Sequence, residues 1–232
     1  MSEKRKIGRR AACAAMLGVG GSLLVARPSP AQKRRRPADA APAPVLRNAD
    51  FYKDGKFNEQ AAKDTYLAML RRFGYPISDQ LVKNLFVTDF AVGRFLEVGL
   101  GTIIWISEKD ANYTTLDIFL LPGQMIPEHW HVALEGEKVP AKLESWLVRW
   151  GTSYIYGEGE PTAKPANKPH ASEAKFITVW HEKVCKPGDT AGIRKPLEKH
   201  WQQAGPEGVI VSEVSTYHTG TAVRFTNPSI KF

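Results

Sequence analysis

The chain contains only two cysteines, Cys13 and Cys185, among 232 residues. Cys13 lies in an N-terminal stretch that we interpret below as an export signal, so Cys185 is the single thiol of the remaining chain. One thiol cannot form an internal disulfide, which excludes a disulfide-stapled fold for the mature protein. We expect Cys185 to be a small buried side chain rather than a nucleophile.

The chain also lacks a net charge outside its first 46 residues. The formal net charge is +8, but residues 1–46 contain ten Lys or Arg and two Asp or Glu, whereas residues 47–232 contain 22 of each. A neutral domain does not attract nucleic acids or anionic membranes over long distances, so a nucleic-acid-binding function is not supported. With 43% hydrophobic residues and six Trp, the composition is that of a globular domain with a core.

No hydrophobic run is long enough for a comfortable membrane span. The stretch Ala11–Ala26 is rich in Ala and Gly and has the proportions of a secretory signal. The pair Arg9-Arg10 directly before it resembles a twin-arginine export signal. Cleavage could follow Ala26 or Ala31, and an uncleaved N-terminal anchor is the alternative.

These features suggest three parts of the chain. We expect residues 1–31 to be an export signal, which would make the protein periplasmic. Residues 32–49 are rich in Pro, Ala and Arg, cannot bury enough apolar surface to fold, and are expected to be a linker. Residues 50–232 are expected to form one domain.

Helices are predicted only at the start of this domain. Residues 57–73 place apolar side chains at a helical period, with Asn58 as the N-cap and Gly74 after the end. A second, short helix is expected to begin at Ser78. The helical segment therefore covers residues 57–86.

The pattern then changes to short apolar or alternating runs, separated by Gly, Pro, Asn and Asp. These runs are predicted to be strands: 84–91, 94–98, 102–107, 113–121, 143–150, 153–157, 175–183, 208–215 and 222–225. Many short strands without alternating helices predict an all-β sandwich or barrel. The polar, Pro-rich residues 158–174 are expected to be a surface loop, with His170 exposed to solvent.

Two histidines, His129 and His131, are separated by one residue. In a β-strand, side chains two residues apart point to the same face, so both imidazoles can reach one metal ion. Glu144 follows at the start of the apolar run SWLVRW. Two imidazoles and a carboxylate suit Mn, Fe, Co, Ni or Zn, although an isolated histidine pair also occurs by chance.

The spacing resembles the first motif of the cupin family. Gly123 is followed by five residues, His129, one residue and His131, and Glu144 is followed by six residues and Gly151. The loop before Glu144 is longer than in the usual pattern. The resemblance implies a cupin barrel, which is a jelly roll or double-stranded β-helix.

Two other acids, Glu135 and Glu137, compete with Glu144, but they lack a glycine at the required distance and we interpret them as solvated loop charges. A cupin takes a fourth ligand, a histidine, from a second motif downstream. The stretch CKPGDTAGIRKPLEKHWQQAG suggests His200, although the usual asparagine after it is absent. We expect His181 to be a core or supporting imidazole and His218 to line the pocket mouth.

More closely, residues 50–232 resemble the cupin-type D-lyxose isomerases. The resemblance rests on the paired histidines, on Lys142 two residues before Glu144, and on the segments WLVRWGTSYIYGEGE and GVIVSEVST. It implies an aldose–ketose isomerase that acts on a free sugar such as D-lyxose, interconverted with D-xylulose through an enediol. We expect one divalent metal ion, Mn²⁺ first, with Zn, Fe, Co or Ni as alternatives, and a homodimer.

Such a reaction needs a group that takes a proton from C2 and returns it to C1. Val209, Val211 and Glu213 share one strand face, so Glu213 is a buried acid if that face points inward and a solvated charge if it points outward. Lys142 shares a face with Glu144 and could supply a proton or hold an oxyanion. Glu213 and Lys142 are the candidate catalytic residues, and the sequence does not assign the base.

The candidate substrate contacts are Gln124, Glu128, Trp150 and His218. Polar side chains can bind sugar hydroxyls, and an aromatic ring can stack on the apolar face of a sugar. Gln124 and Glu128 could instead hydrogen-bond a ligand imidazole. Trp130, between the paired histidines, faces away from the metal in a regular strand and is expected to be structural.

The same ligand set serves other chemistry, which leaves two further hypotheses. One is an iron-dependent cupin oxygenase, although Arg149 is the only arginine close to the ligands in sequence that could clamp an acidic cosubstrate. The other is a non-catalytic sugar-binding cupin that retains its metal.

Overall fold

The computed structural model describes residues 45–232. The predicted export signal at 1–31 and the predicted linker up to residue 44 lie outside the described residues. The first described element is the short 3-10 helix η1 (Asn48–Phe51), which begins just before the predicted domain boundary. Within residues 45–232, no helix has both the length and the apolar character that a membrane span requires.

The N-terminal part contains a two-stranded hairpin and two α-helices: β1 (Tyr52–Lys53), β2 (Lys56–Phe57), α1 (Glu59–Arg72) and α2 (Asp79–Asn84). Helix α1 begins after the predicted N-cap Asn58, whose Oδ1 accepts from Ala61 N at 3.2 Å. Helix α2 begins where a helix was predicted, and Ser78 Oγ caps it by accepting from Leu81 N at 3.2 Å. Gly74 follows α1 with φ of 68°, a left-handed conformation that favours glycine.

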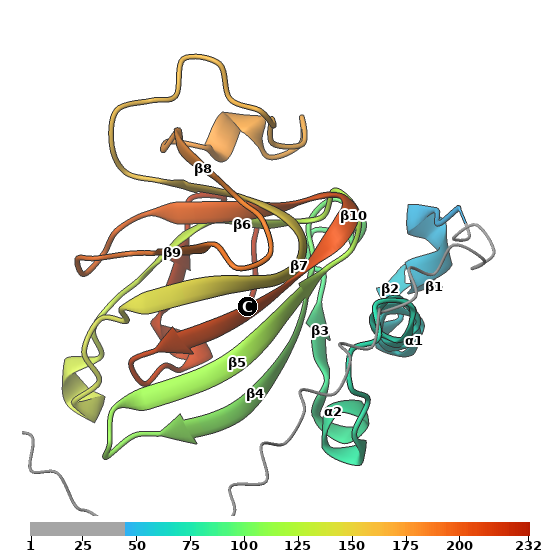
Figure 1. The fold of residues 1–232 in the computed structure, drawn as a ribbon, viewed down its shortest axis with the longest axis horizontal. Coiled ribbons are helices and arrows are strands. Elements are labelled where there is room, and N and C mark those ends of the chain that lie inside the picture. Colours follow the sequence, from blue (N-terminus) through green and yellow to red (C-terminus); the bar gives the residue numbers. More distant parts are fainter. Residues whose placement is uncertain (1–44) are drawn as a thin grey trace, which may run out of the picture. The chain divides into compact units, whose positions relative to one another are not determined.

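The remaining elements form one large antiparallel sheet that curls on itself (Figure 1). Its strands are β3 (Phe86–Thr88), β4 (Leu100–Glu108), β5 (Tyr113–Leu120), β6 (Met125–His131), β7 (Glu144–Gly157), β8 (His181–Cys185), β9 (Thr190–Gly192), β10 (His200–Ser215) and β11 (Val223–Phe225). The strands follow the order β11-β6-β10-β5-β4-β3, and β7 pairs with β10, β8 and β9. Three short 3-10 helices lie in the loops: η2 (Glu135–Glu137), η3 (Ala174–Phe176) and η4 (Gly220–Ala222).

Several predicted strand boundaries are wrong. The runs 143–150 and 153–157 form the single strand β7, because Gly151 adopts φ of 76° and the chain stays extended beyond it. The predicted strand 94–98 is a turn, in which the backbone N–H groups of Glu97 and Val98 donate to Arg94 O. The run 175–183 begins as η3, and β8 starts only at His181.

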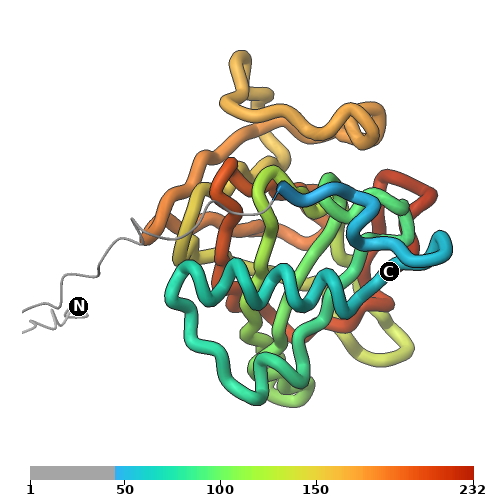
Figure 2. Tube along the Cα trace, turned by 90° about the vertical axis from the view of Figure 1, so that its right-hand side faces the viewer, coloured from blue at the N-terminus to red at the C-terminus, as the bar shows by residue number. Residues whose placement is uncertain are grey.

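The curled sheet has a core on each face. On β10, Val209 and Val211 are fully buried on the inner face, while Ile210 belongs to the cluster that packs against the helical part of the chain. Helix α1 crosses the strands on this outer side, where Tyr66 and Leu70 are fully buried (Figure 2). This alternation along one strand is the reason that a polar site can form inside while a second core forms outside.

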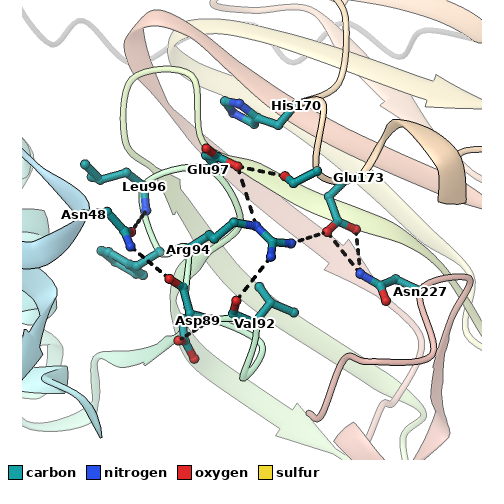
Figure 3. Close-up of polar contacts among 12 residues, drawn as sticks. Asn48, Asp89, Val92, Arg94, Leu96, Glu97, His170, Glu173 and Asn227 are labelled. Carbon is teal, nitrogen blue, oxygen red and sulfur yellow. Dashed lines mark hydrogen bonds and ion pairs between the residues drawn. The ribbon is translucent and has the colours of Figure 1, made fainter. Parts of the chain in front are cut away.

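The long loop between β7 and β8 is fastened by a buried carboxylate. Glu173 is 1% exposed and accepts hydrogen bonds from Arg94 Nη2 at 2.8 Å and from Asn227 Nδ2 at 3.0 Å (Figure 3). His170 in the same loop is half-buried, with Nε2 2.8 Å from Gly123 O. The prediction of an exposed His170 is therefore wrong, because polar composition does not reveal how a loop is anchored.

Cys185 is fully buried, as predicted, at the end of β8. Its position in the inner core agrees with its interpretation as a small packing residue.

Candidate metal centre and active site

Four side chains from three strands converge inside the curled sheet. Donor atoms of His129, His131, Glu144 and His200 all lie within 4.8 Å of one another. His129 and His131 point to one face of β6, and the backbone of His200 pairs directly with that of His129. Glu144 opens β7, so pairing of β6, β7 and β10 brings the four groups together.

Backbone hydrogen bonds orient two of the imidazoles. His129 Nδ1 is 2.8 Å from Pro127 O, and His200 Nδ1 is 3.0 Å from Glu198 O. If Nδ1 carries the proton and donates the hydrogen bond to the carbonyl, Nε2 is unprotonated. The lone pair of each Nε2 can then bind a metal ion. His200 Nε2 is buried without a hydrogen-bond partner among the described residues, 3.0 Å from Glu144 Oε1.

The ionisation of the cluster also suits a cation. Desolvation lowers the pKa of His129 and His131, so both imidazoles are neutral near pH 7. Burial alone would raise the pKa of Glu144, but Lys142 and His131 outweigh it and hold the pKa below its usual range. With the imidazole of His200, the two neutral imidazoles and one carboxylate form a donor set that fits a divalent transition metal.

The competing acids and histidines lie elsewhere. Glu135 and Glu137 are exposed in η2, as solvated loop charges should be. His181 is exposed, with Nδ1 3.1 Å from Glu160 O, so the prediction of a core or supporting imidazole is wrong. The strand that contains it begins at His181 itself, and its first side chain points to solvent.

A buried lysine links two carboxylates beside the cluster. Lys142 Nζ is 2.7 Å from Glu144 Oε2 and 2.5 Å from Glu213 Oε1. Glu213 is 3% exposed, and the inward-facing alternative for Val209, Val211 and Glu213 is the one observed. Trp146 Nε1 donates to Glu213 Oε2 at 3.3 Å. The acid and the lysine are thus held rigidly next to the proposed metal ligands.

The pKa values of Glu213 and Lys142 are both raised, but for different reasons. Burial, followed by the negative charge of Glu144, raises the pKa of Glu213 to about 7. Burial would lower the pKa of Lys142, but Glu144 and Glu213 outweigh it and raise the pKa above its usual range. Near neutral pH, the site therefore combines a protonated lysine with a carboxylate that can accept or release a proton.

His218 lies at the same end of the site. Its ring meets that of His131 edge-on, with 4.9 Å between centroids, and burial lowers its pKa to about 3. Its Nδ1 is buried without a partner among the described residues. As expected, His218 lines the pocket.

The pocket is a cavity of about 580 Å³, a size common for small-molecule sites. The four clustered residues together with Lys142, Glu213, His218 and Gln202 form most of its polar wall, and Asn84, Thr102 and Thr219 add smaller polar groups. Most other lining residues are apolar: Phe86, Phe90, Leu100, Ile104, Leu116, Ile118, Ile126, Trp146, Val223, Phe225 and Phe232.

Two predicted substrate contacts are structural instead. Gln124 is fully buried and bonds Tyr66 Oη at 2.5 Å and Leu121 N at 3.0 Å, away from the cavity. Glu128 is adjacent to His129 in a strand and so points to the opposite face, where it accepts from Thr178 N at 2.5 Å. Neither lines the cavity.

Trp150 is also wrongly predicted as a substrate contact. The register of β7 against β10 shifts between Val148 and Trp150, which turns Trp150 to the outer face. Its ring stacks on Phe73, with 3.3 Å between centroids. Trp146, on the inner face before this bulge, lines the cavity in its place.

Sequence reasoning overlooked Gln202 and the apolar wall. Gln202 lies two residues after His200 and therefore shares its strand face. This spacing could have predicted that Gln202 lies near the site. The apolar residues of β3 and β4 carried no such signal, because an apolar pattern predicts core packing whether or not a cavity remains.

The comparisons with known proteins fit this geometry. No protein-family model matches the chain. The D-lyxose/D-mannose isomerase of Thermosediminibacter oceani is 36% identical over 162 residues, which cover 70% of this chain and 87% of the relative. The D-lyxose ketol-isomerase of Cohnella laeviribosi is 37% identical over 171 residues, covering 73% and 91%.

Solved structures resemble the fold. The L-ribose isomerase of Acinetobacter sp. DL28 has a TM-score of 0.58 at 14% identity, covering 73% of this chain and 91% of that chain. The L-ribose isomerase of Cellulomonas parahominis has a TM-score of 0.55 at 15% identity, covering 74% and 92%. These similarities and the curled antiparallel sheet confirm the predicted all-β cupin fold. With 34–37% identity to relatives over most of their length, the chain belongs to the D-lyxose ketol-isomerase family.

Proposed function

We propose that this protein interconverts D-lyxose and D-xylulose as a metal-dependent aldose–ketose isomerase. The substrate assignment is supported by the named activities of the curated relatives. The observation that carries the mechanism is the position of Lys142 Nζ, 2.7 Å from Glu144 and 2.5 Å from Glu213 inside the cavity.

His129, His131, Glu144 and His200 are the residues that would hold the metal. A bound divalent ion would act as a Lewis acid on adjacent oxygens of the open-chain sugar. We propose Mn²⁺, since the carboxylate of Glu144 is an oxygen ligand of the kind that suits Mn²⁺, and metal analysis of the purified protein tests this choice.

Glu213 is proposed to transfer the carbon-bound proton. The C2–H bond of the aldose breaks as Glu213 takes the proton, an enediol forms between C1 and C2, and Glu213 returns the proton to C1. A pKa of about 7 allows both the acceptance and the return of this proton near neutral pH. Trp146 Nε1 holds the carboxylate in place through its bond to Oε2.

Lys142 is proposed to stabilise charge on the sugar oxygens. The reaction also moves a proton from O2 to O1, so negative charge develops on these oxygens. Because Lys142 remains protonated between two carboxylates, its ammonium group can donate a hydrogen bond to such an oxygen. Its burial removes competing water and strengthens this interaction.

The test is solvent deuterium incorporation at C2 of D-lyxose, followed by NMR. The unmodified protein should exchange C2–H and form D-xylulose, whereas Glu213→Gln should lose both while retaining its metal. Glu207→Gln is the matched control, because Glu207 lies on the same strand but accepts from Thr152 Oγ1 away from the cavity. Exchange that persists in Glu213→Gln would overturn the assignment of the base.

We also propose that the protein acts as an exported homodimer. The support for export is the basic and Ala-rich sequence of residues 1–31, and the support for a dimer is the resemblance to cupins. Cell fractionation of the full chain and light scattering of the purified protein test the two statements separately.

A further inference from the structure

The side chains that line the cavity change from polar to apolar along rows of paired residues on neighbouring strands. Glu213 on β10 pairs with Leu116 on β5, and Leu116 pairs with Ile104 on β4. These three lining residues form one row, which runs from a carboxylate to an aliphatic side chain in two strand spacings, about 10 Å.

The next row is similar. Ile118 on β5 pairs with Thr102 on β4, and Thr102 pairs with Phe86 on β3. All three line the cavity. The wall formed by β3, β4 and β5 is therefore apolar apart from one hydroxyl group at Thr102.

Apart from the exposed Asn84 at the end of α2, the polar lining groups on this side, away from the clustered residues, are already engaged. Thr102 Oγ1 donates to Asp117 O at 2.9 Å. Thr219 Oγ1, across the mouth, lies 2.6 Å from Thr221 Oγ1. Gln202 Nε2 donates to Ser153 Oγ at 2.6 Å. The far end of a bound ligand therefore meets few free hydrogen-bonding groups.

Ile104 is 51% exposed and Phe86 is 48% exposed, so a ligand that reaches them removes apolar surface from water. A methyl group gains more from this contact than a hydroxymethyl group, which must give up part of its hydration. If C1 and C2 lie at Lys142 and Glu213, as the proposed function requires, C5 and C6 lie toward Ile104 and Phe86. From this gradient we infer that the site favours sugars whose far end is apolar, and that among hexoses it prefers 6-deoxyhexoses. This inference rests on the proposed function for the orientation of the sugar.

The test compares D-mannose with 6-deoxy-D-mannose, which differ only in the hydroxyl at C6. The metal-loaded full chain should have a kcat/KM about 10-fold higher for the 6-deoxy sugar, because its methyl group covers the exposed apolar wall without losing the hydration of a hydroxyl. Equal values, or a preference for D-mannose, would overturn the inference.

Two variants test whether Ile104 is responsible for the preference for the 6-deoxy sugar. Ile104→Asn places hydrogen-bonding groups on the apolar wall and should reduce the ratio toward one. Ile106→Asn is the matched control, because Ile106 is similarly exposed on the same strand but does not line the cavity. If Ile104→Asn alters the oligomeric state and leaves the ratio unchanged, the wall is an interface and the inference fails.

Binding separates this inference from the proposed function. Calorimetry with D-mannitol and 6-deoxy-D-mannitol, which cannot isomerise, measures the preference without turnover. Tighter binding of the deoxy alditol without turnover of any sugar supports the apolar site and overturns the isomerase proposal. Turnover of D-lyxose and D-mannose with no preference in either assay overturns only the inference, and absence of both binding and turnover overturns both.

Discussion

At the scale of single residues, the site depends on charges that are buried together. Lys142 is 5% exposed and Glu213 is 3% exposed, and each would be unfavourable alone in this surrounding. Their mutual contact, with Glu144 on the other side of the lysine, makes the arrangement stable while it keeps both charged groups at the cavity.

We predict that Lys142→Met lowers the free energy of unfolding by about 3 kcal/mol, because it leaves two facing buried carboxylates without their cation. Adding Glu213→Gln should recover part of this loss, since one of the two charges is then removed. Urea unfolding of the single and double variants measures both effects. Lys164→Met, at an exposed position, should change stability little, and a similar loss there would contradict the explanation.

The pKa of Glu213 predicts the pH dependence of activity. A base acts only when it is ionised, and burial raises this pKa to about 7. We therefore expect kcat/KM of the metal-saturated protein to rise with pH through about 7 and to fall tenfold per pH unit well below it. A profile that stays flat between about pH 5.5 and 7.5 would contradict the assignment of Glu213 as the base.

At the scale of secondary structure, one bulge decides which tryptophan belongs to the site. Trp146 and Trp150 are both on β7, at a spacing that a regular strand would place on one face. The register shift near Trp150 instead directs Trp146 to Glu213 and Trp150 to Phe73 at the end of α1. The same strand thus serves the cavity and the outer core.

The two tryptophans should respond differently to substitution. Trp150→Ala should lower the free energy of unfolding by about 2 kcal/mol and leave KM unchanged, because it removes aromatic packing outside the cavity. Trp146→Phe should reduce kcat by about 10-fold, since it removes the hydrogen bond to the proposed base. Steady-state kinetics and thermal unfolding of both variants test this, and a raised KM in Trp150→Ala would contradict it.

The helices and the histidine pair were predictable because each has a local signature, whereas Glu144 and His200 were assigned through the resemblance to cupins. Asn58 and Ser78 cap the two helices, and the spacing of His129 and His131 indicates that both side chains lie on one face of a strand. Trp150 and Glu128 were misplaced because a bulge and a loop contact depend on partners far away in the sequence. The apolar wall near Ile104 was missed because packing residues and cavity residues have the same pattern.

At the scale of the whole molecule, a metal ion would connect three strands that are distant in sequence. Binding to the folded state alone stabilises it by about 2.7 kcal/mol when free metal is 100 times its Kd. We therefore expect chelation to lower the thermal midpoint, and His131→Ala to remove most of this metal-dependent shift. Glu137→Gln, in the exposed η2, should retain it, and a shift that survives in His131→Ala would place the metal elsewhere.

Strand β10 carries His200 at its start and Glu213 near its end, and it pairs with β5, β6 and β7. Contacts between segments this far apart form slowly during folding. A ribosome-bound chain that has not yet released residue 215 consequently cannot complete β10, the strand that positions His200 and Glu213. Under the proposed mechanism, turnover during refolding should therefore return no earlier than the pairing of β10 with its three neighbours.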